Sequence, residues 1–232
     1  AWEVEAAVSH DGTTSLQPGW RSETLFQKKK KERERESHYI LSYLLAHSIL
    51  VLCNFFNKLD KEISVVAVKD KDEINIVAVV ENEHRNNILY RSKVPTTATK
   101  EQENLAIEYT KRILSGFDYY GVLTVEFFIS EGKVIFNEIA PRVHNSGHIT
   151  MQSATKSQFR AHIEAICGLK VGKIENKETT LYNILGQDLD YYIDVYKNNG
   201  GYLHLYEKEP RQDRKVGHIN FYGDVILGGE HD

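Results

Sequence analysis

The sequence has few cysteines, no excess of positive charge and no secretion signal, and each absence excludes a class of protein. Its two cysteines, Cys53 and Cys167, lie far apart in no metal or redox spacing, so we expect buried thiols in a reducing compartment. The formal net charge of −4 and the lack of a basic stripe in the part expected to fold argue against a nucleic-acid partner. No basic and apolar leader is visible at the start. We therefore expect a cytoplasmic protein.

Residues 1–57 differ in composition from the rest of the chain. Residues 1–37 show no sustained period and end in four lysines followed by a Glu-Arg alternation, which is typical of a solvated helix or of disorder. The segment is also similar to a translated interspersed genomic repeat, which would make it a chimeric part never selected to fold. Residues 39–56 form an uncharged, mostly apolar stretch. A buried helix, more unselected translation and a membrane anchor are its open interpretations.

From about Lys58 onward the sequence alternates β-rich runs with helical patterns. A cap at Thr96, Thr97 or Thr99 predicts a helix to about Leu114, stopped by Ser115-Gly116, and its expected apolar stripe is Leu105, Tyr109 and Ile113. A second helix is expected at 157–167, ending at Gly168. The predicted strands are 62–69, 74–80, 122–129 and 133–138, then short runs within LYNILG, YLHLYEK and KVGHINFYGDVIL.

These elements predict an α+β fold, in which a hairpin-rich antiparallel sheet carries flanking helices. The turn DKDE joins the first two strands, and Glu131-Gly132 joins the third and fourth. We expect three parts: residues 1–57, a main domain over 58–170, and a small β-rich C-terminal domain over 171–232.

Two glutamates, Glu126 and Glu138, stand inside apolar runs on either side of the Glu131-Gly132 turn. Since strand side chains alternate, Val122, Thr124, Glu126 and Phe128 are expected on one side of their strand, and Val134, Phe136 and Glu138 on one side of the next. The turn then makes the glutamates cross-strand neighbours, where they repel unless a cation lies between them. Such oxygen ligands suit Mg²⁺, and Asn137 can add or orient a ligand. The alternative is an exposed face on which both glutamates pair with lysines.

The loop after the second glutamate, APRVHNSGH, concentrates polar groups. Such a loop offers anion-binding donors beside the proposed metal. Its members are Arg142, His144, Asn145, Ser146, Gly147 and His148. His144 and His148 are also candidate zinc ligands, but Asn-Ser-Gly between them disfavours the helix that would place both on one face.

These residues carry a resemblance to a known family. VEFF…VIFNEIAPRVHNSGH resembles the signature of the N5-carboxyaminoimidazole ribonucleotide synthetases, ATP-grasp ligases of purine biosynthesis. The resemblance begins near Lys58 and runs almost to the C-terminus. It also includes the segments EISVVAV, VVENEHRNNIL, SQFRAHIEAICGL, NILG and HLYEKEPRQDRKVGH, in the order of the family.

The resemblance implies ATP and Mg²⁺ as cofactors, and bicarbonate and 5-aminoimidazole ribonucleotide as substrates. It implies that Glu126 and Glu138 hold Mg²⁺ on the nucleotide phosphates. The remaining implied roles are a nucleotide contact for Glu62 (on the ribose), His84 and Asn137; catalysis by Arg142, His144 and Asn145; and substrate binding by Arg142, Asn145, Ser146, Arg214 and Lys215. The implied reaction is an ATP-driven carboxylation through carboxyphosphate. Homodimers are common in the family.

The resemblance covers only the C-terminal half of such a ligase. The family's upstream nucleotide-fold domain, phosphate-binding lysines and glycine-rich lid have no counterpart here, and NFFN replaces the acidic adenine hinge at 54–57. We therefore expect the chain as given to be an incomplete version, inactive alone. The competing interpretations are a non-catalytic binding or assembly module and a variant tethered to a membrane by residues 39–56.

Overall fold

The computed structural model describes residues 7–8, 14–15 and 59–227. The chain forms two compact units, residues 1–43 and 44–232. In the first, β1 (Ala7–Val8) pairs with β2 (Thr14–Ser15). The stretch 39–56 and Cys53 lie outside the described residues, whereas Cys167 is exposed at the end of its helix, so the expectation of a buried thiol is wrong there. Within the described part, no helix has the length and apolarity needed to cross a membrane.

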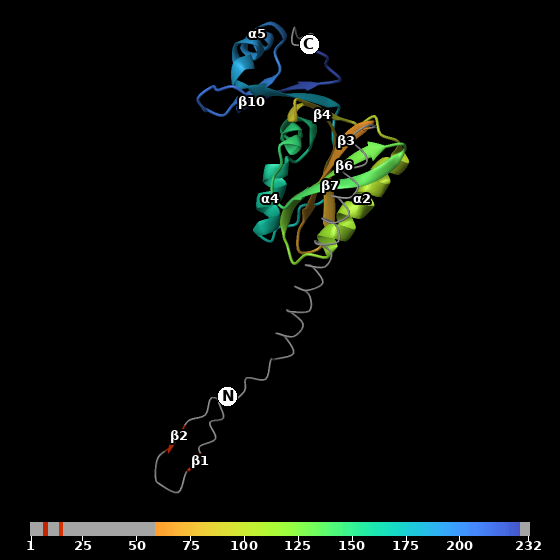
Figure 1. Cartoon of the computed structure of the whole chain (residues 1–232), viewed down its shortest axis with the longest axis vertical. Coiled ribbons are helices and arrows are strands. Elements are labelled where there is room, and N and C mark those ends of the chain that lie inside the picture. The colour runs from red at the N-terminus through yellow and green to blue at the C-terminus, as the bar shows by residue number, and fades with distance from the viewer. Residues whose placement is uncertain (1–6, 9–13, 16–58, 228–232) are drawn as a thin grey trace. The chain divides into compact units, whose positions relative to one another are not determined.

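One antiparallel sheet of eight strands organises the second unit, in the order β7-β6-β3-β4-β5-β8-β10-β9 (Figure 1). This confirms the predicted α+β class. Because β5 pairs with β8, the sheet continues without a break into the predicted C-terminal domain, whose boundary at residue 170 stays a prediction. The strands are β3 (Lys61–Lys69), β4 (Ile74–Arg85), β5 (Ile88–Val94), β6 (Gly121–Ser130), β7 (Lys133–Ala140), β8 (Thr179–Leu185), β9 (Tyr202–Leu205) and β10 (Lys215–Tyr222).

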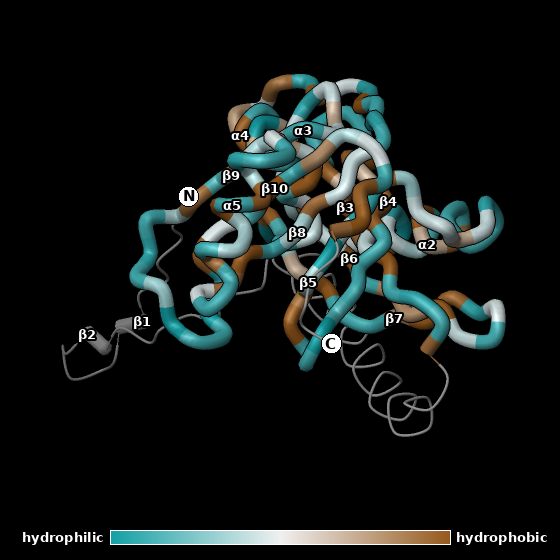
Figure 2. Tube along the Cα trace, turned by 90° about the horizontal axis from the view of Figure 1, so that it is seen from above, coloured by the Kyte–Doolittle hydropathy of each residue, from teal (hydrophilic) through white to brown (hydrophobic). Residues whose placement is uncertain are grey.

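Both faces of the central strand β3 are covered, which explains its almost unbroken apolar run. Ile63, Val65 and Ala67 point to one core cluster, and Val66 and Val68 point to another. Helix α2 (Lys100–Ser115) covers the first face and α4 (Gln158–Ile166) the second, on opposite sides of the sheet in Figure 1. Figure 2 shows β3 in brown, inside the molecule. A strand packed on both faces cannot alternate apolar with polar residues, except where the chemistry of a site requires it.

Helix α2 begins as predicted, but its buried stripe differs from the predicted one. Thr99 is the N-cap and forms a capping box with Gln102. The buried positions are Ala106, Thr110 and Leu114, so the prediction of Leu105, Tyr109 and Ile113 is wrong by one residue. Leu105, Tyr109 and Ile113 flank the contact line, whereas Ala106, Thr110 and Leu114 occupy it. The Thr110 hydroxyl donates to the Ala106 carbonyl oxygen at 2.9 Å, which satisfies it within the core.

The remaining helices follow β7 and β8. Helix α4 has Ser157 as its N-cap and ends before Gly168, as predicted. Helix α5 was not predicted, because its aromatic and β-branched residues also suit a strand; its Tyr192 and Val195 are buried one turn apart. Helix α5 spans Leu189–Asn199. The short helical elements are η1 (Ser146–Ile149), α3 (Thr150–Ser153) and η2 (Gly186–Asp188).

The capping box predicts the effect of one substitution. Thr99→Ala removes the side-chain oxygen that accepts from the Gln102 N–H at 3.3 Å, so the free energy of unfolding should fall by about 1 kcal/mol. Urea unfolding followed by circular dichroism measures this loss. Thr99→Ser keeps the hydroxyl and should retain most of the stability; equal losses in both variants would contradict the capping role.

Candidate functional site

The β6–β7 hairpin places Glu126 and Glu138 opposite one another by means of a β-bulge. Its Glu131-Gly132 turn has both residues at positive φ, 48° and 79°, as a two-residue type I′ turn requires. The register runs regularly from the turn to Phe127↔Phe136 and then shifts, so that Glu126 pairs with Glu138. The predicted pairing is therefore confirmed.

Asn137 is the extra residue of this bulge. In a regular ladder Asn137 would stand opposite Glu126, and Glu138 would share the face of Val134 and Phe136. Those two residues pack in the core beneath α2, so the prediction that they share a side with Glu138 is wrong. The bulge turns Glu138 to the opposite face, beside Glu126. The half-buried Asn137 therefore sets the site by its backbone.

Burial and neighbouring charge keep Glu126 from ionising easily. The residue is 8% exposed, and desolvation together with the charges of Glu62 and Glu138 raises its pKa to about 7. His144 Nε2 lies 3.6 Å from Oε1 of Glu126 and 4.0 Å from Oε1 of Glu138. Burial, with Arg142 and Lys215 nearby, lowers the pKa of His144 to about 4. The imidazole is therefore neutral at pH 7 and is no counter-charge for the carboxylates.

The donor set fits a hard divalent cation. Ligand atoms of Glu126, Glu138 and His144 all lie within 4.8 Å of one another. A cation among them would favour the ionised form of Glu126 and relieve its repulsion with Glu138. The alternative of an exposed face with lysine partners does not fit, because Glu126 is buried against His144. The zinc alternative does not fit either, since His148 is not part of this cluster.

Glu62 and His84 lie on the same face, on β3 and β4. His84 Nδ1 is 3.3 Å from Oε2 of Glu62, and this hydrogen bond is the main cause that raises the pKa of His84. The charges of Glu126 and Glu138 act in the same direction. The structure therefore brings the two residues predicted for the nucleotide into one electrostatic field with the glutamate pair.

A buried glutamine holds the loop that carries His144. The His144 N–H donates to Gln158 Oε1 at 2.9 Å, and Gln158 Nε2 donates to the His144 carbonyl oxygen at 2.7 Å. A Cβ on Gly147 would lie 2.2 Å from Gln158 Oε1, so a larger residue there would displace the amide that holds His144. The Ser146 hydroxyl lies 3.0 Å from His144 Nδ1 and is fully buried. Ser146 thus contacts the histidine rather than open space.

Asn145 and Lys215 meet although they are distant in sequence, whereas Arg142 and Arg214 stay on the surface. The Lys215 ammonium donates to Asn145 Oδ1 and lies 3.3 Å from His148 Nδ1. Burial lowers the pKa of Lys215 to about 7. Arg142 and Arg214 are exposed, and Arg142 Nη1 donates to the Val143 carbonyl oxygen at 3.0 Å.

A column of stacked rings behind Lys215 was missed in the sequence. His148 stacks on His218 at 5.2 Å between ring centroids, and His218 on His204 at 4.6 Å. Phe159 continues the column beyond His148, at 5.4 Å. The signal in the sequence was one histidine in each of the segments HLY and GHIN. These segments pair in the sheet and place His204 opposite His218.

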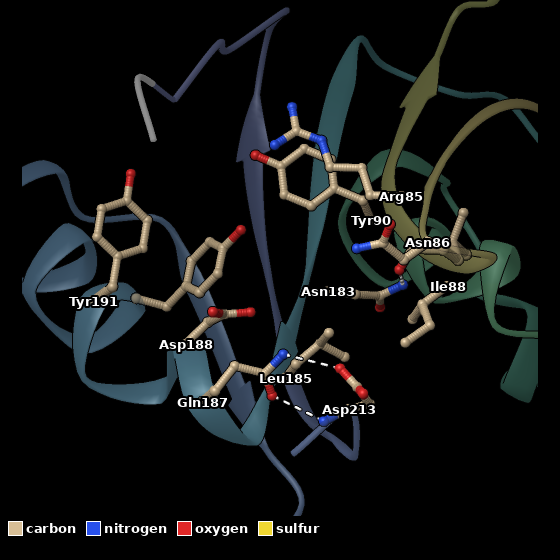
Figure 3. Close-up of a pocket in the computed structure, with 12 residues that line it drawn as sticks. Arg85, Asn86, Ile88, Tyr90, Asn183, Leu185, Gln187, Asp188, Tyr191 and Asp213 are labelled. Carbon is tan, nitrogen blue, oxygen red and sulfur yellow. Dashed lines mark hydrogen bonds between the residues drawn. The ribbon is translucent and has the colours of Figure 1, made fainter. Parts of the chain in front are cut away.

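A separate cavity of about 250 Å³ lies where the β4–β5 turn meets β8 and α5 (Figure 3). Tyr90 and Tyr191 contribute rings to its wall, and Asp213 and Gln187, which also line it, are joined by two hydrogen bonds, of 2.9 and 3.2 Å. None of the residues predicted for the site lines this cavity. The residues predicted for the site therefore lie outside this cavity.

Two family models match the chain. Residues 28–159 match the ATP-grasp domain, and residues 179–226 match the phosphoribosylaminoimidazole carboxylase C-terminal domain. The first match contains the glutamate pair and the His144 loop, and the second contains Lys215.

Individual relatives agree with these models. The chain is 38% identical over 176 residues to the N5-carboxyaminoimidazole ribonucleotide synthase of Vibrio parahaemolyticus, covering 75% of this chain and 46% of the relative. The Staphylococcus aureus N5-carboxyaminoimidazole synthetase with ADP has a TM-score of 0.68 and 35% identity, covering 73% of this chain and 47% of that one. The Aspergillus clavatus synthase with ADP and 5-aminoimidazole ribonucleotide has a TM-score of 0.67 and 29% identity, covering 73% and 48%. The chain spans about half the length of the curated relatives it matches.

The raised pKa of Glu126 predicts a pH-dependent stability. Because its folded pKa of about 7 lies above the ordinary 4.5, the carboxyl contributes full stability below about pH 4.5 and loses it as the pH rises through 7. The substituted side chain carries no charge in the Glu126→Gln variant. At pH 8 the free energy of unfolding of this variant should therefore be roughly 3 kcal/mol higher than that of the unchanged chain. Urea unfolding at pH 5 and pH 8 checks this.

Millimolar Mg²⁺ should reduce the difference at pH 8, because a bound cation offsets the carboxylate repulsion. A control is Glu108→Gln, an exposed helix residue, which should show little pH dependence. A difference for Glu126→Gln that is equal at pH 5 and pH 8 would contradict the assignment.

Proposed function

Because the chain belongs to the ATP-grasp family and resembles the N5-carboxyaminoimidazole ribonucleotide synthases, we propose that it serves the ATP-dependent carboxylation of 5-aminoimidazole ribonucleotide by bicarbonate. This is a ligase reaction of purine biosynthesis. The proposal assigns ATP, Mg²⁺, bicarbonate and the ribonucleotide to this chain as ligands.

One observation carries the proposal: the bulged hairpin sets Glu126 opposite Glu138, with neutral His144 against both. Phosphoryl transfer needs mainly positioning and neutralisation of charge. When bound, Mg²⁺ on these glutamates would neutralise charge on the nucleotide phosphates. Around it, Glu62 faces the nucleotide ribose with His84 beside it, and Asn137 sets the bulge.

The proposed reaction proceeds in two transfers. An oxygen of bicarbonate attacks the γ-phosphorus of ATP, the bond to the bridging oxygen breaks, and ADP leaves with formation of carboxyphosphate. The exocyclic amine of the aminoimidazole then attacks the carboxyl carbon, inorganic phosphate leaves, and the amine gives up a proton. Carboxyphosphate is labile in water, so the residues around it must exclude solvent.

The loop residues divide between the two substrates. Arg142, near His144 on the exposed side of the loop, offers a guanidinium to bicarbonate and to the developing phosphate charge. His144, held by Gln158 and Ser146, is neutral and can accept the proton of bicarbonate or of the amine. Ser146 therefore acts through His144.

Asn145 and Lys215 are proposed to bind the ribonucleotide, with Arg214 at the surface beside them. A phosphate dianion next to Lys215 would raise its pKa again and make it a cation when the ligand is present. The pair comes from the loop and from β10, so this part of the site exists only when the C-terminal strands join the sheet.

Nucleotide binding tests the proposal. By calorimetry, ADP should bind the purified chain more tightly with Mg²⁺ than without it. Glu138→Gln should weaken the Mg²⁺-dependent part about tenfold or more. Glu108→Gln serves as the matched exposed control and should bind as the unchanged chain does. ADP binding that ignores Mg²⁺ in a folded protein would contradict the metal assignment.

Turnover separates the ligase from a binding module. ADP release that requires ATP, bicarbonate and 5-aminoimidazole ribonucleotide together, and that Glu138→Gln abolishes, would support the ligase in this chain. Retained nucleotide binding without such release would favour the alternative, a non-catalytic binding or assembly module. Gel filtration coupled to light scattering would test the homodimer.

A further inference from the structure

A row of buried polar side chains crosses four strands on the sheet face that carries Glu126. In the ladder, Ser92 stands opposite Asn82, Asn82 opposite Glu62, and Ser64 opposite Glu126. Glu62 and Ser64 lie two residues apart on β3 and therefore share a face. None of the five residues is more than 9% exposed. Polar groups this deep within a sheet need partners, because each unsatisfied one is costly.

The hydrogen bonds of the row connect its members in sequence. Ser92 Oγ donates to Asn82 Oδ1 at 3.0 Å. Asn82 Nδ2 donates to Ser64 Oγ at 2.5 Å and to Glu62 Oε1 at 3.5 Å. Ser64 Oγ then donates to Glu126 Oε1 at 3.3 Å. One carboxamide thus reaches one glutamate directly and the other through a single hydroxyl.

The direction of these bonds follows from the orientation of the Asn82 amide. A carboxamide has two donors on its nitrogen and only acceptors on its oxygen, and a hydroxyl has one hydrogen. If the Asn82 amide were reversed, its oxygen would face Glu62 and repel it. Ser64 would then have to donate to Asn82 and would leave Glu126 without a donor. The observed orientation is the one in which both glutamates receive a hydrogen.

We propose that Asn82 and Ser64 are positioning residues that hold Glu62 and Glu126 in one fixed arrangement. The inference rests on the proposed function, in which Glu62 contacts the nucleotide ribose and Glu126 the metal on the phosphates. Ser64 orients the metal-binding carboxylate alone, whereas Asn82 orients both. The Asn82 side chain therefore fixes the position of Glu62, at the ribose, relative to that of Glu126, at the metal.

Two binding measurements separate these roles: the affinity for Mn²⁺, followed by electron paramagnetic resonance, and the preference for ATP over 2′-deoxy-ATP, followed by calorimetry. Ser64→Ala should weaken Mn²⁺ binding about tenfold and leave the ribose preference unchanged. Asn82→Ala should weaken Mn²⁺ binding about as much and also remove most of the ribose preference. Ser92→Ala is the matched control, because it removes a donor to Asn82 but no donor to a glutamate; both measurements should stay within about twofold.

A third measurement needs neither metal nor nucleotide. In a double-mutant cycle of Ser64→Ala and Glu126→Gln, followed by urea unfolding at pH 8, the two changes should be non-additive if the hydroxyl holds the carboxylate. Additive changes would overturn the proposal. Non-additive changes in a chain that binds neither Mn²⁺ nor ATP would support the positioning role and count against the proposed function instead.

If the unchanged chain binds Mn²⁺ and ATP but Ser64→Ala and Asn82→Ala bind them equally well, the positioning role is overturned while the proposed function stands. Equal losses in all three variants, Ser92→Ala included, would indicate a general weakening of the sheet and would also overturn it.

Discussion

The cost of holding carboxylates within an apolar sheet is the constraint on which the rest of the site depends. A buried, ionised glutamate is stable only with hydrogen-bond donors, opposite charge or both. Glu126 has the Ser64 hydroxyl, two like charges nearby and a neutral imidazole. These surroundings raise the pKa of Glu126, and a cation beside its carboxylate would stabilise the ionised form. The excess of negative charge around Glu126 therefore favours cation binding at this site.

The bulge at Asn137 and the hydrogen bonds of Gln158 together position Glu138 and His144 beside Glu126. A regular hairpin would bury Glu138 beneath α2 with Val134 and Phe136, where no cation could serve both glutamates. A free loop would let His144 swing away from them. One inserted residue and one buried carboxamide therefore place three ligand groups within 4.8 Å of one another.

The continuity of the sheet gives the C-terminal strands a part in this site. Lys215 reaches Asn145 because β10 joins β8, and β8 joins β5. The ring column of His148, His218 and His204 packs at the same junction. The contact between Asn145 and Lys215 is thus built from both matched segments.

The sequence by itself determined most of the helices and strands, though not β5 or α5, and it indicated the pairing of Glu126 with Glu138. The Thr99 cap, the Glu131-Gly132 turn and the strand-like run around Glu126 are local patterns, so they could be recognised without a structure. Local patterns cannot show a bulge, because Asn137 differs from its neighbours only in what stands opposite it. They also cannot show that α2 buries Ala106 and Thr110 rather than Leu105 and Tyr109. Nor can they show the hydrogen bond from Lys215 to Asn145, which are 70 residues apart. The tertiary structure alone decided these, since each depends on which strand or helix lies next to the residue rather than on the residues beside it in the chain.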